Sequence, residues 1–453
     1  MSRAFNARDP RLLRNVPLVL LANALLLSPI ALVTADELTD QNWFQWRGPL
    51  GTGVALNADP PIEWNETKNI RWKVALPGKG HSTPIVWGDR VFVTAAIPYG
   101  DELEPRYSGR PGAHDNLPVK QHHRFEVLAI DRRTGKILWQ KTVREARPHE
   151  GGHYTASLAS SSPVTDGGSV FAFFGSYGLS CLDMNGNVQW QADLGDMHSK
   201  HGHGEGSSPV LHGDTLVVNW DHEEQSFLVA FDKRTGRPRW KVTREEVTSW
   251  ATPIVVEHNG DPQLVVSGTG RVRGYDLSTG KVIWECGGLS ANIVATPVAA
   301  DGMVFAGSSY EKRAMLAIRH EGAKGDIAET KHVAWTRMTG TPYVPSPLLY
   351  GNSLYFLRHY QGILSRVNSK TGKDDGGPFR LGAIRDVYAS PVAAANRIYI
   401  TDRDGRTQVI THSDHPDVLA VNQLNDSFSA SAAIVNNELF LRGERYLYCI
   451  AEK

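Results

Sequence analysis

The segment DMHSKHGHGEGSSP, residues 196–209, carries the residue types that are best suited to bind a metal ion. His201 and His203 are two positions apart, and Glu205 follows at the same spacing. In an extended segment alternate side chains point to the same side, so these three would face one ligand. The sequence therefore predicts a metal site at His201, His203 and Glu205. The alternative is a polar, glycine-rich loop whose histidines are solvated or hydrogen-bonded to nearby carbonyl groups.

The elements that would position this segment recur along the chain. AIDRRTGKILW (129–139), AFDKRTGRPRW (230–240) and GYDLSTGKVIW (274–284) follow one pattern, and CLDMNGNVQW (181–190) is a shorter variant. The Asp can bond nearby backbone N–H groups, and the Gly can take the positive φ that closes a tight turn. The Trp that follows is large and flat, so we expect it to fill the gap to the next sheet.

A second pattern precedes each of these turns and marks the start of a strand. It places Ser or Thr before Pro and then an alternating apolar run, as in ATPVAADGMVFA. Proline at the first residue of a strand loses no ladder hydrogen bond. The prolines of this pattern are Pro84, Pro163, Pro209, Pro253, Pro297, Pro347 and Pro391. A period near 45 residues, built from short strands and turns, is typical of a β-propeller.

The repeats predict an all-β fold, an eight-bladed β-propeller with four-stranded blades that occupies residues 36–453. The eighth blade begins near 429, has Ala433 in place of the proline and contains three strands before the chain ends. We expect NIRWKVAL (69–76), with Trp72, to supply its fourth strand. The propeller would then close by pairing an N-terminal strand with the C-terminal hairpin, which removes exposed sheet edges.

Residues 1–35 differ in composition from the rest of the chain. A basic start is followed by an apolar run and by Val33-Thr34-Ala35, a small-residue cleavage site, which predicts a secretory signal peptide. The alternative is an uncleaved membrane anchor. We therefore expect an exported protein, periplasmic or extracellular. Its three cysteines fall in separate blades and are expected to be buried thiols.

The order of strands also predicts which face carries the loops. Two kinds of connection lie on one face, here called the top. They are the loops between the second and third strand of each blade and the loops from one blade to the next. The insertion 97–124 belongs to this face and is expected to form an irregular lid. We expect ligand-binding residues on top loops and just before the innermost strands: His81, His153, Trp250, Tyr343, Arg385 and Tyr388. The alternative is that such side chains only fill the central channel.

The Ala-x-Asp-x-x-Thr-Gly-x-x-x-Trp repeats resemble the tryptophan-docking motif of the quinoprotein superfamily, the propellers related to pyrroloquinoline quinone (PQQ) dehydrogenases. The opening WFQWRGPLGTGVA (43–55) is similar to the start of secreted bacterial PQQ-like propellers. The resemblance implies either a PQQ- and calcium-dependent oxidoreductase that acts on an alcohol or sugar, or a non-catalytic scaffold of the BamB type. The chain lacks the adjacent cysteine pair common in the dehydrogenases, so it resembles the scaffolds more closely.

The sequence therefore predicts a monomeric, non-catalytic binding or scaffold module whose top face meets a protein or glycan partner. A PQQ- and calcium-dependent dehydrogenase is the first alternative. A polysaccharide- or metal-binding propeller is the second. The formal net charge is zero and no basic stripe is present, so a nucleic-acid partner is not expected.

Overall fold

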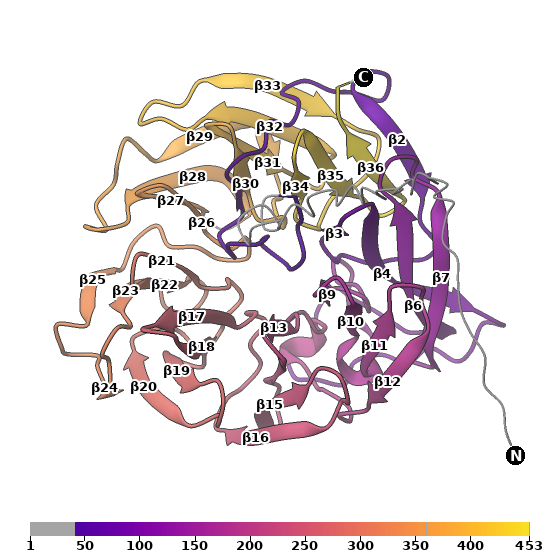
Figure 1. The fold of residues 1–453 in the computed structure, drawn as a ribbon, viewed down its shortest axis with the longest axis horizontal. Helices are drawn as coiled ribbons and strands as arrows, with labels where there is room; N and C mark the ends of the chain where they lie inside the picture. The colour runs from indigo at the N-terminus through magenta and orange to yellow at the C-terminus, as the bar shows by residue number, and fades with distance from the viewer. Residues whose placement is uncertain (1–40, 359, 453) are drawn as a thin grey trace, which may run out of the picture.

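Short β-sheets arranged around a central axis make up the fold (Figure 1). The computed structural model describes residues 41–358 and 360–452, and the predicted signal peptide at 1–35 lies outside the described residues. Eight sheets of four or five strands are the blades, so the prediction of an all-β, eight-bladed propeller is confirmed. None of the helices in the described ranges is both long and apolar enough to cross a membrane.

Blades one to four follow the chain in order, each running from the axis outward. Blade one contains β3 (Ile85–Trp87), β4 (Arg90–Tyr99), β6 (His122–Asp131) and β7 (Ile137–Ala146). Blade two contains β9 (Val164–Thr165), β10 (Ser169–Phe173), β11 (Leu179–Asp183) and β12 (Val188–Ala192). Blade three contains β13 (Val210–His212), β14 (Thr215–Trp220), β15 (Ser226–Asp232) and β16 (Pro238–Arg244). Blade four contains β17 (Ile254–His258), β18 (Asp261–Gly268), β19 (Arg271–Asp276), β20 (Val282–Gly287) and the added β24 (Gly325–Asp326).

Blades five to eight complete the ring. Blade five contains β21 (Val298–Ala300), β22 (Met303–Ser308), β23 (Ala314–Arg319) and β25 (Val333–Arg337). Blade six contains β26 (Leu348–Tyr350), β27 (Ser353–Leu357), β28 (Gln361–Asn368) and β29 (Phe379–Arg385). Blade seven contains β30 (Val392–Ala394), β31 (Arg397–Thr401), β32 (Arg406–Thr411), β33 (Val418–Gln423) and the added β1 (Val54–Ala55). Blade eight contains β34 (Ala433–Val435), β35 (Glu438–Arg442), β36 (Tyr446–Ile450) and β2 (Ile70–Ala75).

Blade eight draws its strands from both ends of the described chain. β2 pairs antiparallel with β36, with Trp72 opposite Cys449 (Figure 1). One detail of the sequence interpretation is corrected here. Ser431 accepts the hydrogen bond that an equivalent Ser or Thr accepts in other blades, so Ala432 rather than Ala433 takes the position of the missing proline.

The tryptophans of the outer strands bridge neighbouring blades, as expected. The indole N–H of Trp240 in blade three donates to the Leu277 carbonyl in the turn of blade four at 2.9 Å. A Cβ on Gly280 of that turn would lie 2.7 Å from the Trp240 ring. Trp284 differs, because the turn of blade five is expanded, and its indole donates to Gln263 of its own blade.

A ring of hydrogen bonds encircles the axis where the Ser/Thr-Pro pattern lies. Each backbone N–H before the proline donates to the hydroxyl of the equivalent residue in the next blade. The bonds run from Thr83 to Ser162, Ser208, Thr252, Thr296, Ser346, Ser390 and Ser431. At the remaining seam, Thr83 Oγ1 has no hydrogen-bond partner among the described residues. There the buried guanidinium of Arg442 donates to Ser82 instead.

The segment 42–55, here called the strap, crosses the axis on the side away from the top. Trp43 pairs with Val86 of blade one, and β1 pairs with β30 of blade seven. Between them the fully buried Arg47 donates to the carbonyls of Pro347 and Pro391 at 2.9 and 2.7 Å. The strap therefore closes the lower end of the central channel.

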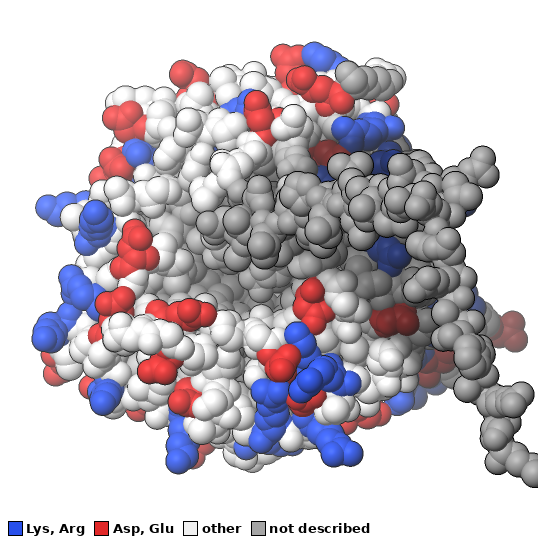
Figure 2. Space-filling model, in the orientation of Figure 1, with Lys and Arg blue, Asp and Glu red and all other residues white. Residues whose placement is uncertain are grey.

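Charged side chains lie around the outside of the propeller. On the face drawn in Figure 2, Lys and Arg are interspersed with Asp and Glu around the rim. This mixed distribution accords with the formal net charge of zero.

Candidate functional site

A cavity of about 460 Å³ opens at the top end of the axis. Every blade contributes to it through the residues that enter its innermost strand. One such residue from each blade, in order, is His81, Ser160, Gly206, Trp250, Asn292, Val344, Tyr388 and Ser429. Trp46 of the strap also lines the cavity. A pocket of this size suits a small molecule or a side chain inserted by a larger partner.

Most of the ligand-binding residues predicted from the sequence line this cavity. His81, His153, Trp250, Tyr343 and Tyr388 are all on its wall. Burial lowers the pKa of His81 well below its usual value, with nearby cations adding to the effect. The indole N–H of Trp250 donates to the Gly204 carbonyl at 2.7 Å, which fixes one edge of the cavity.

Arg385 is the exception among the predicted residues. It ends the outermost strand β29, is exposed, and is not among the residues that line either top cavity. A cation that does lie against the aromatic wall is Arg403, whose guanidinium carbon is 5.2 Å from the centre of the Tyr388 ring. The second-to-third strand loop of blade seven supplies Arg403, a position that the sequence did not single out.

Tyrosine rings form an arc on the side of blades five to seven. Tyr310 stacks on Tyr343 with ring centres 6.0 Å apart, and Tyr360 stacks on Tyr388 at 4.9 Å. Tyr343 and Tyr360 meet edge to face at 5.4 Å. Such rings offer flat apolar faces with polar rims, a surface that suits sugar rings or apolar side chains.

Histidines gather on the opposite side, over blades one to three. The ring centre of His203 lies 5.2 Å from those of His114 and His153 and 5.4 Å from that of His201. The rings of His114 and His153 are 5.9 Å apart. Burial and the neighbouring histidines lower the pKa of His203 to about 4, so its ring is neutral at pH 7.

Glu205 does not join this cluster in the way the sequence suggested. The segment is not extended, because Lys200–Gly202 form a short 3-10 helix, η2, and His201 has a φ of 55°. The alternation that would align His201, His203 and Glu205 is therefore lost. Glu205 instead accepts hydrogen bonds from the Oγ and backbone N–H of Ser176, at 2.6 and 2.8 Å. Burial raises its pKa to about 7.

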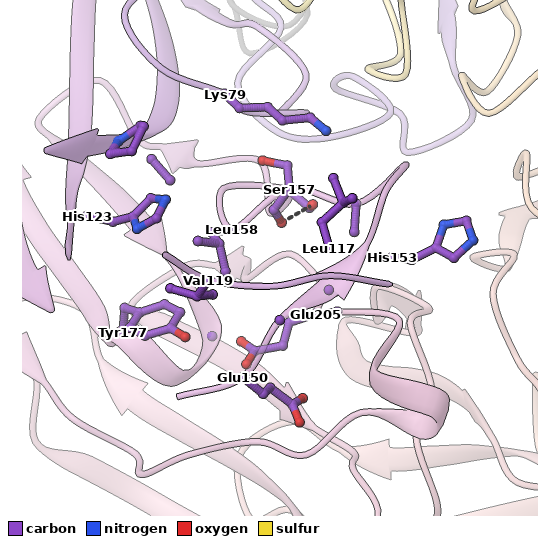
Figure 3. A pocket seen from close by; sticks show the side chains of 18 of the residues that line it. Lys79, Leu117, Val119, His123, Glu150, His153, Ser157, Leu158, Tyr177 and Glu205 are labelled. Atoms are coloured by element: carbon purple, nitrogen blue, oxygen red, sulfur yellow. Dashed lines mark hydrogen bonds between the residues drawn. The ribbon is translucent and has the colours of Figure 1, made fainter. Parts of the chain in front are cut away.

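A second cavity, of about 360 Å³, lies beside the first under the insertion (Figure 3). Leu117, Val119, Leu158 and Tyr177 form apolar parts of its wall, and Glu150 and Glu205 lie next to each other on one side (Figure 3). The two cavities share His153 and Glu205. The pocket is therefore mainly apolar with a small number of ionisable groups.

The insertion itself is more regular than expected. Strand pairing continues to Tyr99 opposite His122, so the loop proper covers 100–121. Within it β5 (Asn116–Leu117) pairs with β8 (Gly152–His153). The Asn116 side chain donates to the carbonyls of His201 and Gly202 at 3.1 and 3.0 Å. These bonds hold the insertion over the side of the top face formed by blades one to three.

The central cavity does not fit a calcium-bound quinone. Calcium prefers several oxygen ligands, usually with more than one carboxylate. Glu205 is the only carboxylate among the described residues that line the cavity, and Ser176 occupies both of its oxygens. The three cysteines are buried in blades two, four and eight.

The comparisons with known proteins agree with this architecture. The curated BamB of Burkholderia pseudomallei is 26% identical over 246 residues, which cover 52% of this chain and only 58% of that relative. BamB from Moraxella catarrhalis superposes with a TM-score of 0.54 at 14% identity, over 78% of this chain and 98% of that one. A quinohemoprotein alcohol dehydrogenase from Pseudomonas putida HK5 superposes with a TM-score of 0.56 at 10% sequence identity. The superposition covers 90% of this chain and 80% of that one. These two structures show a shared fold alone.

The family model described as outer membrane protein assembly factor BamB matches residues 104–241 and 224–449. The matches together span more than half of the chain, and they include strands from every blade. The protein therefore belongs to the family of outer membrane protein assembly factor BamB.

Proposed function

We propose that this protein is an exported, non-catalytic binding propeller that serves outer-membrane protein assembly by holding a protein partner on its top face. Membership of the BamB family supports the assembly role. The curated relative carries that role in its name, and the chain spans less than two thirds of it.

The observation that carries the proposal is a set of exposed apolar side chains on the top connections, of which Leu117, Tyr154 and Tyr310 line the cavities. Tyr107 is 63% exposed, Tyr154 47% and Tyr310 56%, and Leu117 and Met338 are exposed as well. All five lie on top connections. Exposed aromatic groups beside a cavity are typical of surfaces that bind another protein.

Deletion of the gene in the source organism tests the assembly role. The level of folded outer-membrane β-barrel proteins should fall, and the wild-type gene should restore it. Tyr107→Asp and Tyr310→Asp, combined, should not restore it, because charges at the rim oppose an apolar contact. Leu138→Asp is the matched control, since Leu138 is 44% exposed but lies on the outermost strand β7.

Unchanged barrel-protein levels in the deletion strain would reject the assembly role. Full rescue by the Tyr107→Asp, Tyr310→Asp double variant would instead reject the top face as the contact surface. Circular dichroism and thermal unfolding of the purified variants distinguish loss of binding from loss of fold.

A glycan is a second candidate partner, favoured by the stacked pair Tyr360 and Tyr388 beside Arg403. Titration of the purified protein with cell-envelope oligosaccharides, followed by calorimetry, tests it. Tyr388→Ala should abolish binding if the stack is the platform. An identical affinity in that variant would reject this candidate.

A further inference from the structure

We propose that His114, Asp115, His153 and His203 bind one divalent transition-metal ion of the zinc class. The site lies at the top of the central cavity and joins three separate segments. His114 and Asp115 come from the insertion, His153 from β8, and His203 from the connection that follows η2. The proposal keeps one residue of the set predicted from the sequence, His203, and replaces the other two.

The ligand atoms of the first three residues already converge. One ligand atom each from His114, Asp115 and His153 lie within 4.8 Å of one another. His114 Nδ1 and Asp115 Oδ2 are hydrogen-bonded to each other at 3.2 Å, and the ion would replace the proton that they share. Two ligands bound at about 2.0–2.1 Å in tetrahedral geometry would be separated by about 3.3 Å, so this pair is already at that spacing.

His203 is assigned as the fourth ligand; its ring nitrogens are not among the atoms that already converge, so the ring would turn to reach the ion. Its ring centre is 5.2 Å from those of both His114 and His153. Imidazoles that share one tetrahedral zinc ion place their ring centres about 5 Å apart. Nδ1 of His203 is buried and has no hydrogen-bond partner among the described residues. A buried ring nitrogen is costly to leave unpaired, and a metal ion would satisfy it.

Hydrogen bonds orient the ligands from outside. His153 Nδ1 lies 2.7 Å from Thr155 Oγ1 and accepts the backbone N–H of Thr155 at 3.3 Å. Nε2 is therefore the ring nitrogen left for the ion, and it would release its proton on binding. The backbone N–H of Tyr154 donates to the Asp115 carbonyl at 3.0 Å, so the insertion is already registered against β8. These contacts bring the side chains together without the ion, and the ion adds a cross-link between them.

In the second histidine group on the top face, the ring nitrogens of one histidine are already hydrogen-bonded to protein groups. His149, Glu150 and His198 also have converging ligand atoms. However, His149 Nε2 lies 2.8 Å from the Met197 carbonyl and its Nδ1 lies 3.2 Å from the Tyr177 hydroxyl. Both ring nitrogens are therefore occupied by protein groups.

The ion would fasten the insertion over the central cavity. Without it, loop 100–121 is already held by the pairing of β5 with β8, by Asn116 and by the contact of His201 with the Pro111 carbonyl at 2.7 Å. With it, three segments share one centre. Access to the cavity would then depend on the metal, which makes the ion a regulator of partner or ligand binding at the top face.

Zinc titration of the purified, chelator-treated full chain tests the site. Calorimetry should give saturable binding of one ion per chain, and cobalt should give the strong visible absorption of a tetrahedral complex. His114→Ala, His153→Ala and His203→Ala should each weaken binding at least about 10-fold, since even outer partners of a ligand contribute about 10- to 100-fold. His415→Ala, an exposed histidine on the opposite face, is the matched control and should bind normally.

Two further variants separate this site from other arrangements. Glu205→Gln should bind normally, because Ser176 occupies that carboxylate. Asp115→Asn alters an exposed residue, so it should fold normally and still weaken zinc binding. In the wild type, zinc should slow tryptic cleavage after Arg106. Absence of saturable zinc binding, or affinities in His153→Ala and Asp115→Asn equal to that of the wild type, would overturn the proposal.

Discussion

The hydroxyl of Ser176 donates a hydrogen bond of 2.6 Å to Oε1 of Glu205, deep in the wall between the two top cavities. The serine stands in the loop of blade two, and the glutamate enters blade three. The pair therefore ties two blades together beneath the proposed recognition face. Because burial raises the pKa of Glu205 to about 7, this tie depends on pH.

Glu205→Gln should remove part of the pH dependence of stability. The pKa of Glu205 is higher in the folded protein than in the unfolded chain, so the folded state binds more protons between about pH 4.3 and pH 7. Its contribution is present at low pH and is lost as the pH rises through about 7. The loss amounts to about 4 kcal/mol at most.

Urea unfolding at pH 5 and pH 8 measures this effect. Relative to wild type, Glu205→Gln should be more stable at pH 8 than at pH 5. Glu329→Gln, at an exposed position, serves as the control. Equal pH dependence in wild type and Glu205→Gln would show that the carboxyl titrates as it does in the unfolded chain.

Gly280→Ala should destabilise the docking of blade three on blade four. The added Cβ would lie 2.7 Å from the Trp240 ring, and Gly280 has a φ of +72°. The positive φ alone costs about 1–2 kcal/mol, and displacement of the indole adds about 1–3 kcal/mol.

Gly260→Ala is the matched control for that substitution. Gly260 has a φ of +83°, and a Cβ there meets nothing within 4 Å. Denaturant unfolding of both variants isolates the contact with the tryptophan. The same free-energy loss in both would mean that tryptophan docking contributes nothing at this turn.

Thr296→Val should break one link of the hydrogen-bond ring. Its hydroxyl accepts the buried backbone N–H of Thr252 at 2.8 Å. Valine has the same shape but leaves that N–H unpaired, which costs about 1–3 kcal/mol. Thr83→Val makes the same replacement where the hydroxyl has no partner among the described residues, so it should cost little or nothing. Thermal unfolding of the two variants measures the difference. If Thr83→Val lost as much stability as Thr296→Val, the lost hydrogen bond of the ring would not be the cause.

The sequence predicted the fold well because each blade repeats its own turn, proline and tryptophan. It also placed His81, Trp250, Tyr343 and Tyr388 at the axis, since each lies a few residues before an innermost strand. Arg385 was wrongly placed at the axis, because β29 continues to that residue and keeps it on the outermost strand.

The rest of the site depends on contacts that the repeats do not encode. Glu205 does not face the histidine cluster, because η2 interrupts the alternation of side chains along residues 201–205. His114 is in an insertion with no repeat to place it, so only the pairing of β5 with β8 shows that it meets His153. Trp46 was part of a motif quoted for its resemblance alone, and its place beneath the cavity follows from the path of the strap across the axis.

We expect the pairing of β2 with β36 to be a late step in folding. The two strands are separated by nearly the whole described chain, and such distant partners meet slowly. Blades one to seven can form first, and during that interval the flanks of blades one and seven stay exposed to water. Phe92 and Phe440, which share one buried cluster in the finished propeller, remain apart until then. A chain interrupted before Tyr446 would keep that apolar surface open and would be a substrate for chaperones and proteases.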